Sequence, residues 1–177
     1  MKLSLVTLFV ISTALCSVAQ ENQKPIELDV LKGSIGVWDA EIEVWPAGLD
    51  APSTQFKGVE TNRPHGEYWI ASDFDSQFMG QSMKVHSIVG YDLDKKQLVA
   101  TVIDDGPYAA SMTGEYAAKS KTVSWTTHVK DAKGNPIVQK TTISHQNADE
   151  RLLVLSVPDK ATGAFKMFMR IKFVKRK

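Results

Sequence analysis

Cysteine is nearly absent from this sequence. Its 177 residues include one cysteine, Cys16, which lies within the first twenty residues. If that segment is cleaved off, the remaining chain can form no disulfide and has no thiol nucleophile. Such a domain must rely on its hydrophobic core, and a chain of this length is long enough to bury one.

Catalytic and cofactor motifs are also lacking. The chain has no glycine-rich phosphate loop and no metal-binding loop, and its serines lack the context of a nucleophile elbow. Zinc ligands usually have a recognisable local spacing, whereas the four histidines fall on different predicted strands or turns. These histidines are His65, His86, His128 and His145. We therefore expect no metal site, and no cofactor is implied.

Neither sign of charge is in excess. The chain has 21 lysines and arginines against 20 aspartates and glutamates. Without its first 19 residues, which hold Lys2 and no acidic residue, the numbers become equal. This balance gives no indication of nucleic acid or an anionic membrane as a partner.

One long apolar run is present, and it lies at the N-terminus. Residues 3–15 carry no charge, follow Lys2, and precede the small-x-small sequence of residues 17–19. This pattern predicts a secretory signal peptide cleaved after Ala19, because spanning a bilayer takes about 20 apolar residues. We expect an exported bacterial protein, periplasmic or secreted, with no stable membrane anchor after cleavage.

The predicted domain organisation follows from this cleavage site. Residues 1–19 form the signal peptide, 20–25 a disordered leader, and 26–177 one folded domain. A lipoprotein modified at Cys16 is a minor alternative, because the preceding Leu15 is not small.

From residue 37 the apolar residues recur with a period of two. In residues 37–45 the side chains of Trp38, Ala40, Ile42 and Val44 share one face, which is typical of a half-buried strand. Similar segments, separated by short polar turns, are residues 54–62, 68–78, 83–91, 97–104, 109–118, 122–130, 137–145, 151–157 and 164–174. A short helix is predicted before them, at residues 25–33.

This pattern predicts an all-β fold, a single antiparallel up-and-down β-barrel of about ten strands with a short N-terminal helix. Closure of a long sheet removes its exposed edges. A barrel of about this size has an interior suited to one small ligand.

The sequence Gly36-Val37-Trp38 lies between the predicted helix and the first strand. A short helix followed by Gly-x-Trp and a long strand resembles the start of lipocalin-like barrels. In those proteins the tryptophan closes the barrel floor, often against an arginine from a late strand. The resemblance implies a floor made of Trp38 and Arg170, and such stacking stabilises by about 0.5–2 kcal/mol.

A wider set of motifs resembles one bacterial family. These motifs occupy residues 36–46, 66–69, 78–81, 90–92, 101–104, 114–116 and 165–170. Their order is similar to that in the domain-of-unknown-function family numbered 1579, from about residue 28 to 175. Membership implies a lipocalin/calycin-like barrel and leaves the biochemical role unassigned. Two positions depart from the family pattern: Val102 or Ile103 replaces a frequent tryptophan, and one glycine precedes Trp69 in place of two.

The leading functional hypothesis is a barrel that binds a small hydrophobic or amphipathic molecule. Ligand pockets are mostly apolar with a few polar groups, and methionines fill irregular apolar spaces adaptably. The candidate ligand-binding residues are Ile42, Phe56, Glu60, Ser72, Phe74, Val85, Asp104, Met112, Tyr116, Trp125 and Met169.

Other hypotheses remain open. An enzyme would use the cavity for acid–base chemistry on a small substrate, with Asp104 beside Tyr116 or Glu60. A non-catalytic envelope interaction protein would have a filled interior. His145 suits a haem ligand in the manner of nitrobindin-like barrels, although the barrel shape alone supports that assignment.

Overall fold

The computed structural model describes residues 24–78, 80–107, 109–130, 134–159 and 161–177. The predicted signal peptide, Cys16 and residues 20–23 of the predicted leader lie outside the described residues. Lys24 and Pro25, the last two leader residues, are described, and the ammonium group of Lys24 forms an ion pair with Glu67. No helix in the described part of the chain is long and apolar enough to cross a bilayer.

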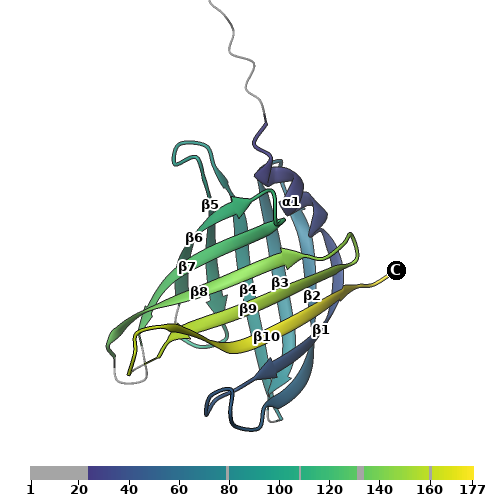
Figure 1. The fold of residues 1–177 in the computed structure, drawn as a ribbon. Helices are drawn as coiled ribbons and strands as arrows, with labels where there is room; N and C mark the ends of the chain where they lie inside the picture. Colours follow the sequence, from purple (N-terminus) through teal and green to yellow (C-terminus); the bar gives the residue numbers. More distant parts are fainter. Residues whose placement is uncertain (1–23, 79, 108, 131–133, 160) are drawn as a thin grey trace, which may run out of the picture.

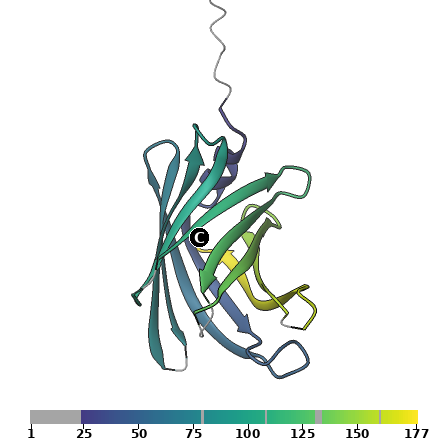
Figure 2. The same ribbon diagram turned by 90° about the vertical axis from the view of Figure 1, so that its left-hand side faces the viewer.

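Ten antiparallel strands form one closed barrel (Figures 1 and 2), as the two-residue period predicts. Each strand pairs with its neighbours in the sequence, and β1 pairs with β10 to close the wall. The strands are β1 (Gly36–Val44), β2 (Thr54–His65), β3 (Trp69–Phe78), β4 (Gln81–Asp92), β5 (Gln97–Asp104), β6 (Ala109–Ala117), β7 (Thr122–Lys130), β8 (Pro136–His145), β9 (Glu150–Pro158) and β10 (Phe165–Lys175).

The helix α1 (Glu27–Gly33) covers one end of the barrel. Acidic residues lie in its first turn and Lys32 in its last, which suits the helix dipole. Leu28 and Leu31 are buried and pack with Ile70, Leu98 and other residues of the barrel interior. We call this end the closed end, and the opposite end of the barrel the open end.

The alternation in the sequence translates directly into inward and outward faces. On β1 the side chains of Trp38, Ala40, Ile42 and Val44 are buried, and the residues between them point outward. Residues that are in register on neighbouring strands lie on the same face of the sheet. The inward residues of β1 therefore identify the inward residues of every other strand, and we call this set the inward phase. One β-bulge interrupts it on β10, between Met167 and Met169. The inserted Phe168 packs against the core.

The inward side chains form two apolar clusters. The first lies under α1 and is built on Ile70, Leu98, Ala100, Val123 and Trp125. Trp125 fits there because its ring lies over Gly114, where a Cβ atom would come within 2.6 Å of it. The second cluster lies along the β1–β10 seam and consists of Trp38, Ala40, Ile42, Val44, Ile171 and Phe173.

Candidate ligand-binding interior

All eleven residues predicted to bind a ligand belong to the inward phase of the wall. One line of strand partners runs from Glu60 through Phe74 and Val85 to Asp104. Other lines contain Ile42 with Phe56, Asn62 with Ser72, Met112 with Thr127, Tyr116 with Val123, Trp125 with Thr141, and Leu155 with Met169. Their orientation follows from the alternation, whereas their role in binding stays a prediction.

Seven of these residues belong to the two clusters or pack against them. Phe56, Phe74 and Met169 pack beside Ile42 in the seam cluster. Met112 and Tyr116 pack beside Trp125 under the helix. The eleven residues therefore line one interior from the closed end to the rim of the open end, where Asp104 is exposed.

Burial of the inward side chains differs around the wall: along β1 it stays high as far as Val44 at the open end, whereas many inward side chains of the other strands are less buried there. Trp38, Ile70, Leu98, Val123 and Phe173 are almost completely buried. Twelve inward side chains toward the open end are only half-buried; these are Phe56, Phe74, Met83, Val85, Val102, Ala110, Met112, Val129, Ile137, Gln139, Leu155 and Met169. A closely packed interior would shield them fully, so solvent reaches the inner wall from the open end.

The residues of the acid–base hypothesis are not brought together. Asp104 ends β5, whereas Tyr116 pairs with Val123 beyond the opposite end of β5. Glu60 lies three strands from Asp104 along a line of strand partners, which at the usual strand spacing is about 14 Å. The Asp104 carboxylate accepts a hydrogen bond from the backbone N–H of Gly106 at 2.9 Å, which is turn chemistry.

The predicted barrel floor is half correct. Trp38 is 0% exposed and lies at the closed end, but Arg170 does not reach it. Arg170 points outward, pairs with Glu43 at 2.5 Å and lies 5.6 Å from the ring centre of Trp45. The reason is strand parity: Arg170 stands between the inward residues Met169 and Ile171.

The arginine on Trp38 is Arg151, at the start of β9. Its guanidinium carbon lies 4.5 Å from the ring centre of Trp38 and 4.2 Å from that of Phe173. Its Nη2 forms an ion pair with the carboxylate of Glu60. Its Nε has no hydrogen-bonding partner among the described residues. The sequence contained a signal for it, because Arg151 shares the phase of Leu153 and Leu155.

Hydrogen bonds connect this floor to the helix. The indole N–H of Trp38 donates to the backbone oxygen of Ser34 at 2.8 Å, and the Asn62 amide donates to the same oxygen at 2.9 Å. Asn62 also donates to Glu60 at 2.9 Å. We call Ser34, Trp38, Glu60, Asn62 and Arg151 the closed-end cluster. It holds the end of α1 against the wall, so Gly-x-Trp is mainly structural.

Gly36 lies at the junction between α1 and β1. Its φ of +129° is a backbone conformation that residues with a Cβ rarely adopt. A Cβ there would also come within 2.9 Å of the Lys175 side chain. The glycine of the Gly-x-Trp motif is therefore required by the bend from helix to strand.

Burial changes the proton affinity of two groups at this end. Desolvation lowers the pKa of Arg151 to about 9, so its guanidinium still carries its charge at neutral pH. Burial, and to a lesser degree the charge of Lys121, lowers the pKa of His145. Because its pKa is lowered, His145 is neutral near pH 7. It lies in register with Arg151.

The other histidines lie outside the interior. His65 ends β2, His86 and His128 are exposed, and His86 contacts Asp73 at 2.7 Å through Nδ1. In the described ranges no three His, Cys, Asp or Glu side chains come together as a metal site would require.

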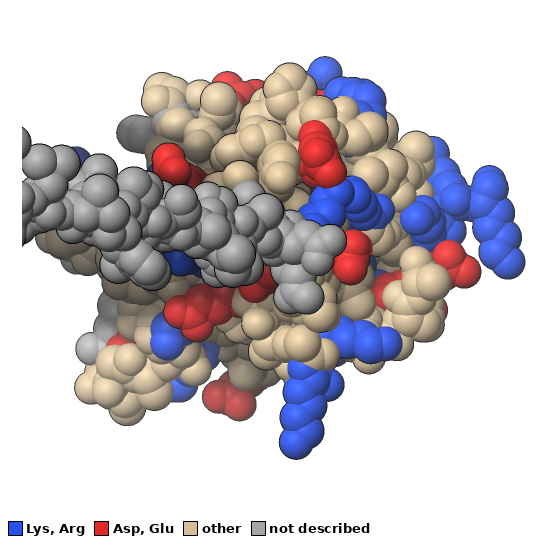
Figure 3. All heavy atoms as spheres, turned by 90° about the horizontal axis from the view of Figure 1, so that it is seen from above, with Lys and Arg blue, Asp and Glu red and all other residues tan. Residues whose placement is uncertain are grey.

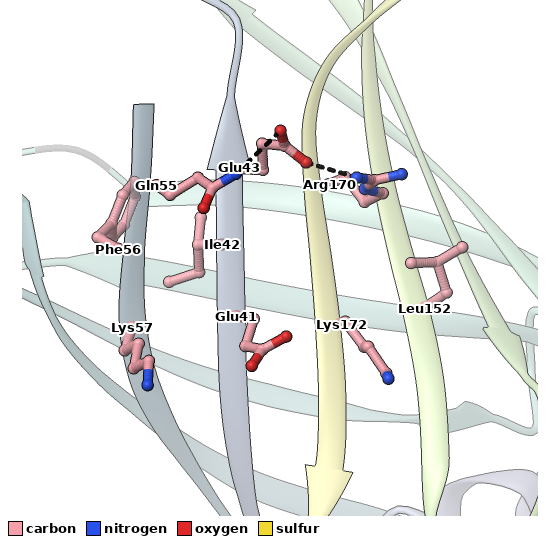
Figure 4. Close-up of a pocket in the computed structure, with 9 residues that line it drawn as sticks. All are labelled: Glu41, Ile42, Glu43, Gln55, Phe56, Lys57, Leu152, Arg170 and Lys172. Atoms are coloured by element: carbon pink, nitrogen blue, oxygen red, sulfur yellow. Dashed lines mark hydrogen bonds and ion pairs between the residues drawn. The ribbon is translucent and has the colours of Figure 1, made fainter. Parts of the chain in front are cut away.

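The outer wall has its own hollow over β1, β2, β9 and β10, about 680 Å³ in volume (Figure 4). Its side chains are mostly charged, and Glu43 is held by Arg170, Ser53 and Gln55. Figure 3, which faces the closed end, shows basic and acidic side chains intermixed. The surface charge thus agrees with the balanced composition.

A comparison with protein families identifies the family of this chain. The model of a family described as "Protein of unknown function (DUF1579)" matches residues 25–175. The chain belongs to this family. The described barrel thus represents a DUF1579 fold. No curated protein sequence matches the chain.

Two solved structures of similar fold extend the comparison. An S-type phycobiliprotein lyase, CPES, from Guillardia theta matches with a TM-score of 0.56 at 9% identity, covering 88% of this chain and 94% of the other. Rv2717c from M. tuberculosis matches with a TM-score of 0.60 at 7% identity, covering 86% and 99%. At these identities the likeness concerns the fold alone.

Proposed function

We propose that this DUF1579 protein binds a small hydrophobic or amphipathic molecule in its barrel, which enters through the open end. The observation that carries the proposal is the uneven burial of the inner wall. Inward side chains are packed under α1 and along the β1–β10 seam, and many on the other strands remain half-buried toward the open end. The half-buried set is mostly apolar, and its aromatic rings and methionines suit a hydrocarbon surface.

Two further observations support binding over the alternatives. The candidate acid and base groups lie apart, which removes the specific pair on which the enzyme hypothesis depended. The polar groups of the closed-end cluster are mainly engaged with one another, so that end serves as a floor. An interaction protein would not need an accessible inner wall.

A titration with 1,6-diphenylhexatriene, a hydrocarbon that fluoresces in apolar surroundings, tests this proposal. We expect saturable binding with one dye per chain. Ala110 lies on the inward face of β6 and is half-buried, and Ser111 beside it is exposed. Ala110→Trp should therefore abolish most dye binding by filling the interior, and Ser111→Trp should leave it unchanged.

Thermal unfolding must show that both variants are folded. Equal dye binding by the two variants would place the dye on the outer surface and contradict the proposal. Failure of the wild-type protein to bind the dye would favour a filled interior instead.

Export belongs to the same proposal. Residues 1–19 have the charge pattern and cleavage site of a signal peptide. Mass spectrometry of the protein from its host is expected to find Gln20 as the first residue. A protein that retains Met1, or one with lipid on Cys16, would contradict cleavage after Ala19.

A further inference from the structure

Three neutral polar side chains lie beside one another on the β7–β8 part of the inner wall, beyond the closed-end cluster. They are Thr127 on β7 and Gln139 and Thr141 on β8, and we call them the β7–β8 polar patch. Thr127 pairs with Gln139, and Thr141 pairs with Trp125. All three therefore have the inward phase, and the two threonines lie diagonally across one pair of strands.

The threonines are buried without protein partners. Thr127 is 5% exposed and Thr141 is 7% exposed. Neither hydroxyl has a hydrogen-bonding partner among the described residues, unlike Ser76, whose hydroxyl donates to the Lys57 carbonyl at 2.9 Å. The patch is therefore a polar surface left without a protein counterpart.

These hydroxyls are not completely sealed from solvent. Within the described chain, the side-chain atoms that are sealed from solvent without a hydrogen bond are two nitrogens of Arg151. The threonine oxygens are not sealed in this way. Water or a ligand atom can therefore reach them, although their residues are almost wholly buried.

The surroundings of the patch are apolar and uncharged. Thr127 lies in register with Met112, and Thr141 lies in register with Leu155. Among the charged residues of the inward phase, Glu60 and Arg151 pair with each other at the closed end, and Asp104 is exposed at the rim of the open end. A carboxylate at the patch would be desolvated with no cation beside it, which is costly.

We propose that the β7–β8 polar patch binds a neutral hydrogen-bonding group, a hydroxyl or a carbonyl, on an otherwise apolar ligand. Diagonal neighbours across a strand pair have Cα atoms about 7–8 Å apart, so one oxygen between the two threonines can contact both. The inference rests on the proposed function and narrows it: the ligand is a neutral amphiphile, such as a long-chain alcohol or ketone.

The test uses two probes that differ in polarity. Diphenylhexatriene has no polar atom, and dodecan-1-ol displaces it while offering one hydroxyl. The double variant Thr127→Val, Thr141→Val removes both hydroxyls and keeps nearly the same side-chain shape. Thr126→Val, Thr142→Val is the matched control, because these threonines are the outward neighbours on the same two strands.

We expect the inward double variant to bind dodecan-1-ol about 25-fold more weakly, since it loses two neutral hydrogen bonds and each contributes about fivefold. Its affinity for diphenylhexatriene should stay within about twofold of wild type, and the outward variant should match wild type for both probes. For the wild-type protein, dodecan-1-ol should displace the dye at a lower concentration than dodecanoate.

The outcomes separate the two proposals. Wild-type protein that binds no dye overturns both of them. Dye binding with unchanged dodecan-1-ol affinity in the inward variant leaves the binding function standing and overturns the role of the patch. Displacement by dodecanoate at the lower concentration would overturn the neutral character of the ligand group.

Discussion

Trp38→Ala should destabilise the protein by about 3–5 kcal/mol, the usual cost of truncating a buried aromatic side chain. Trp38 is completely buried, donates a hydrogen bond to Ser34 and forms one side of the stack that holds Arg151. Its loss therefore opens a cavity at the floor and detaches the end of α1. Urea unfolding followed by far-ultraviolet circular dichroism measures this change.

Trp45→Ala is the matched control for Trp38→Ala. Trp45 follows the same strand at the open end, is half-buried, and has Arg170 5.6 Å from its ring centre. Cation–π contacts at exposed sites contribute about 0.5–1 kcal/mol, so this change should cost much less. Comparable losses from the two substitutions would show that Gly-x-Trp has no special part in closing the barrel.

Glu60→Leu should lower the free energy of unfolding by about 3–5 kcal/mol, as much as Trp38→Ala, because it leaves the buried charge of Arg151 without a counterion. Arg151 is 5% exposed, whereas the Glu60 side chain is 16% exposed. Arg151→Met should therefore cost less, since a lone Glu60 keeps some contact with water and methionine packs between Trp38 and Phe173.

The double variant Glu60→Leu, Arg151→Met completes a thermodynamic cycle. Replacing a buried ion pair by apolar residues is often close to neutral, so the double variant should regain at least about 2 kcal/mol of the Glu60→Leu loss. The same cycle at the more exposed pair, with Glu43→Leu and Arg170→Met, should give a much smaller interaction energy. Additive losses at Glu60 and Arg151 would mean that the two charges do not stabilise each other.

Much of the architecture could be predicted from the sequence because a barrel wall obeys one simple rule. Alternate residues face opposite sides, so the pattern of Trp38, Ala40, Ile42 and Val44 defines the inner face of β1. The turns define which strands are neighbours. The same rule predicted the inward direction of Phe74, Met112 and the other candidates.

The errors arose where a position depends on contacts across the barrel. Arg170 was assigned to the floor from its place on the last strand, although its alternation with Met169 and Ile171 already indicated an outward direction. Arg151 could be recognised as the partner of Trp38 only once the closure of β1 on β10 brought β9 close. The bulge at Phe168 likewise has no local signal in the sequence.

The β7–β8 polar patch was missed for a different reason. Threonine is common in strands on either face, so Thr127 and Thr141 look unremarkable in an alternating segment. Their importance depends on being buried without a hydrogen-bonding partner, and only three-dimensional packing reveals that state. Among the polar residues chosen from the sequence, Asp104 already has a partner in a turn, and Glu60 is paired with Arg151.

A crystal structure of the protein grown with dodecan-1-ol tests the hollow interior most directly. The account predicts an extended ligand inside the barrel, in contact with Phe74 and Met169, with its oxygen within hydrogen-bonding distance of Thr127 or Thr141. An interior filled by the protein's own side chains, with no ligand density at saturating alcohol, would contradict it.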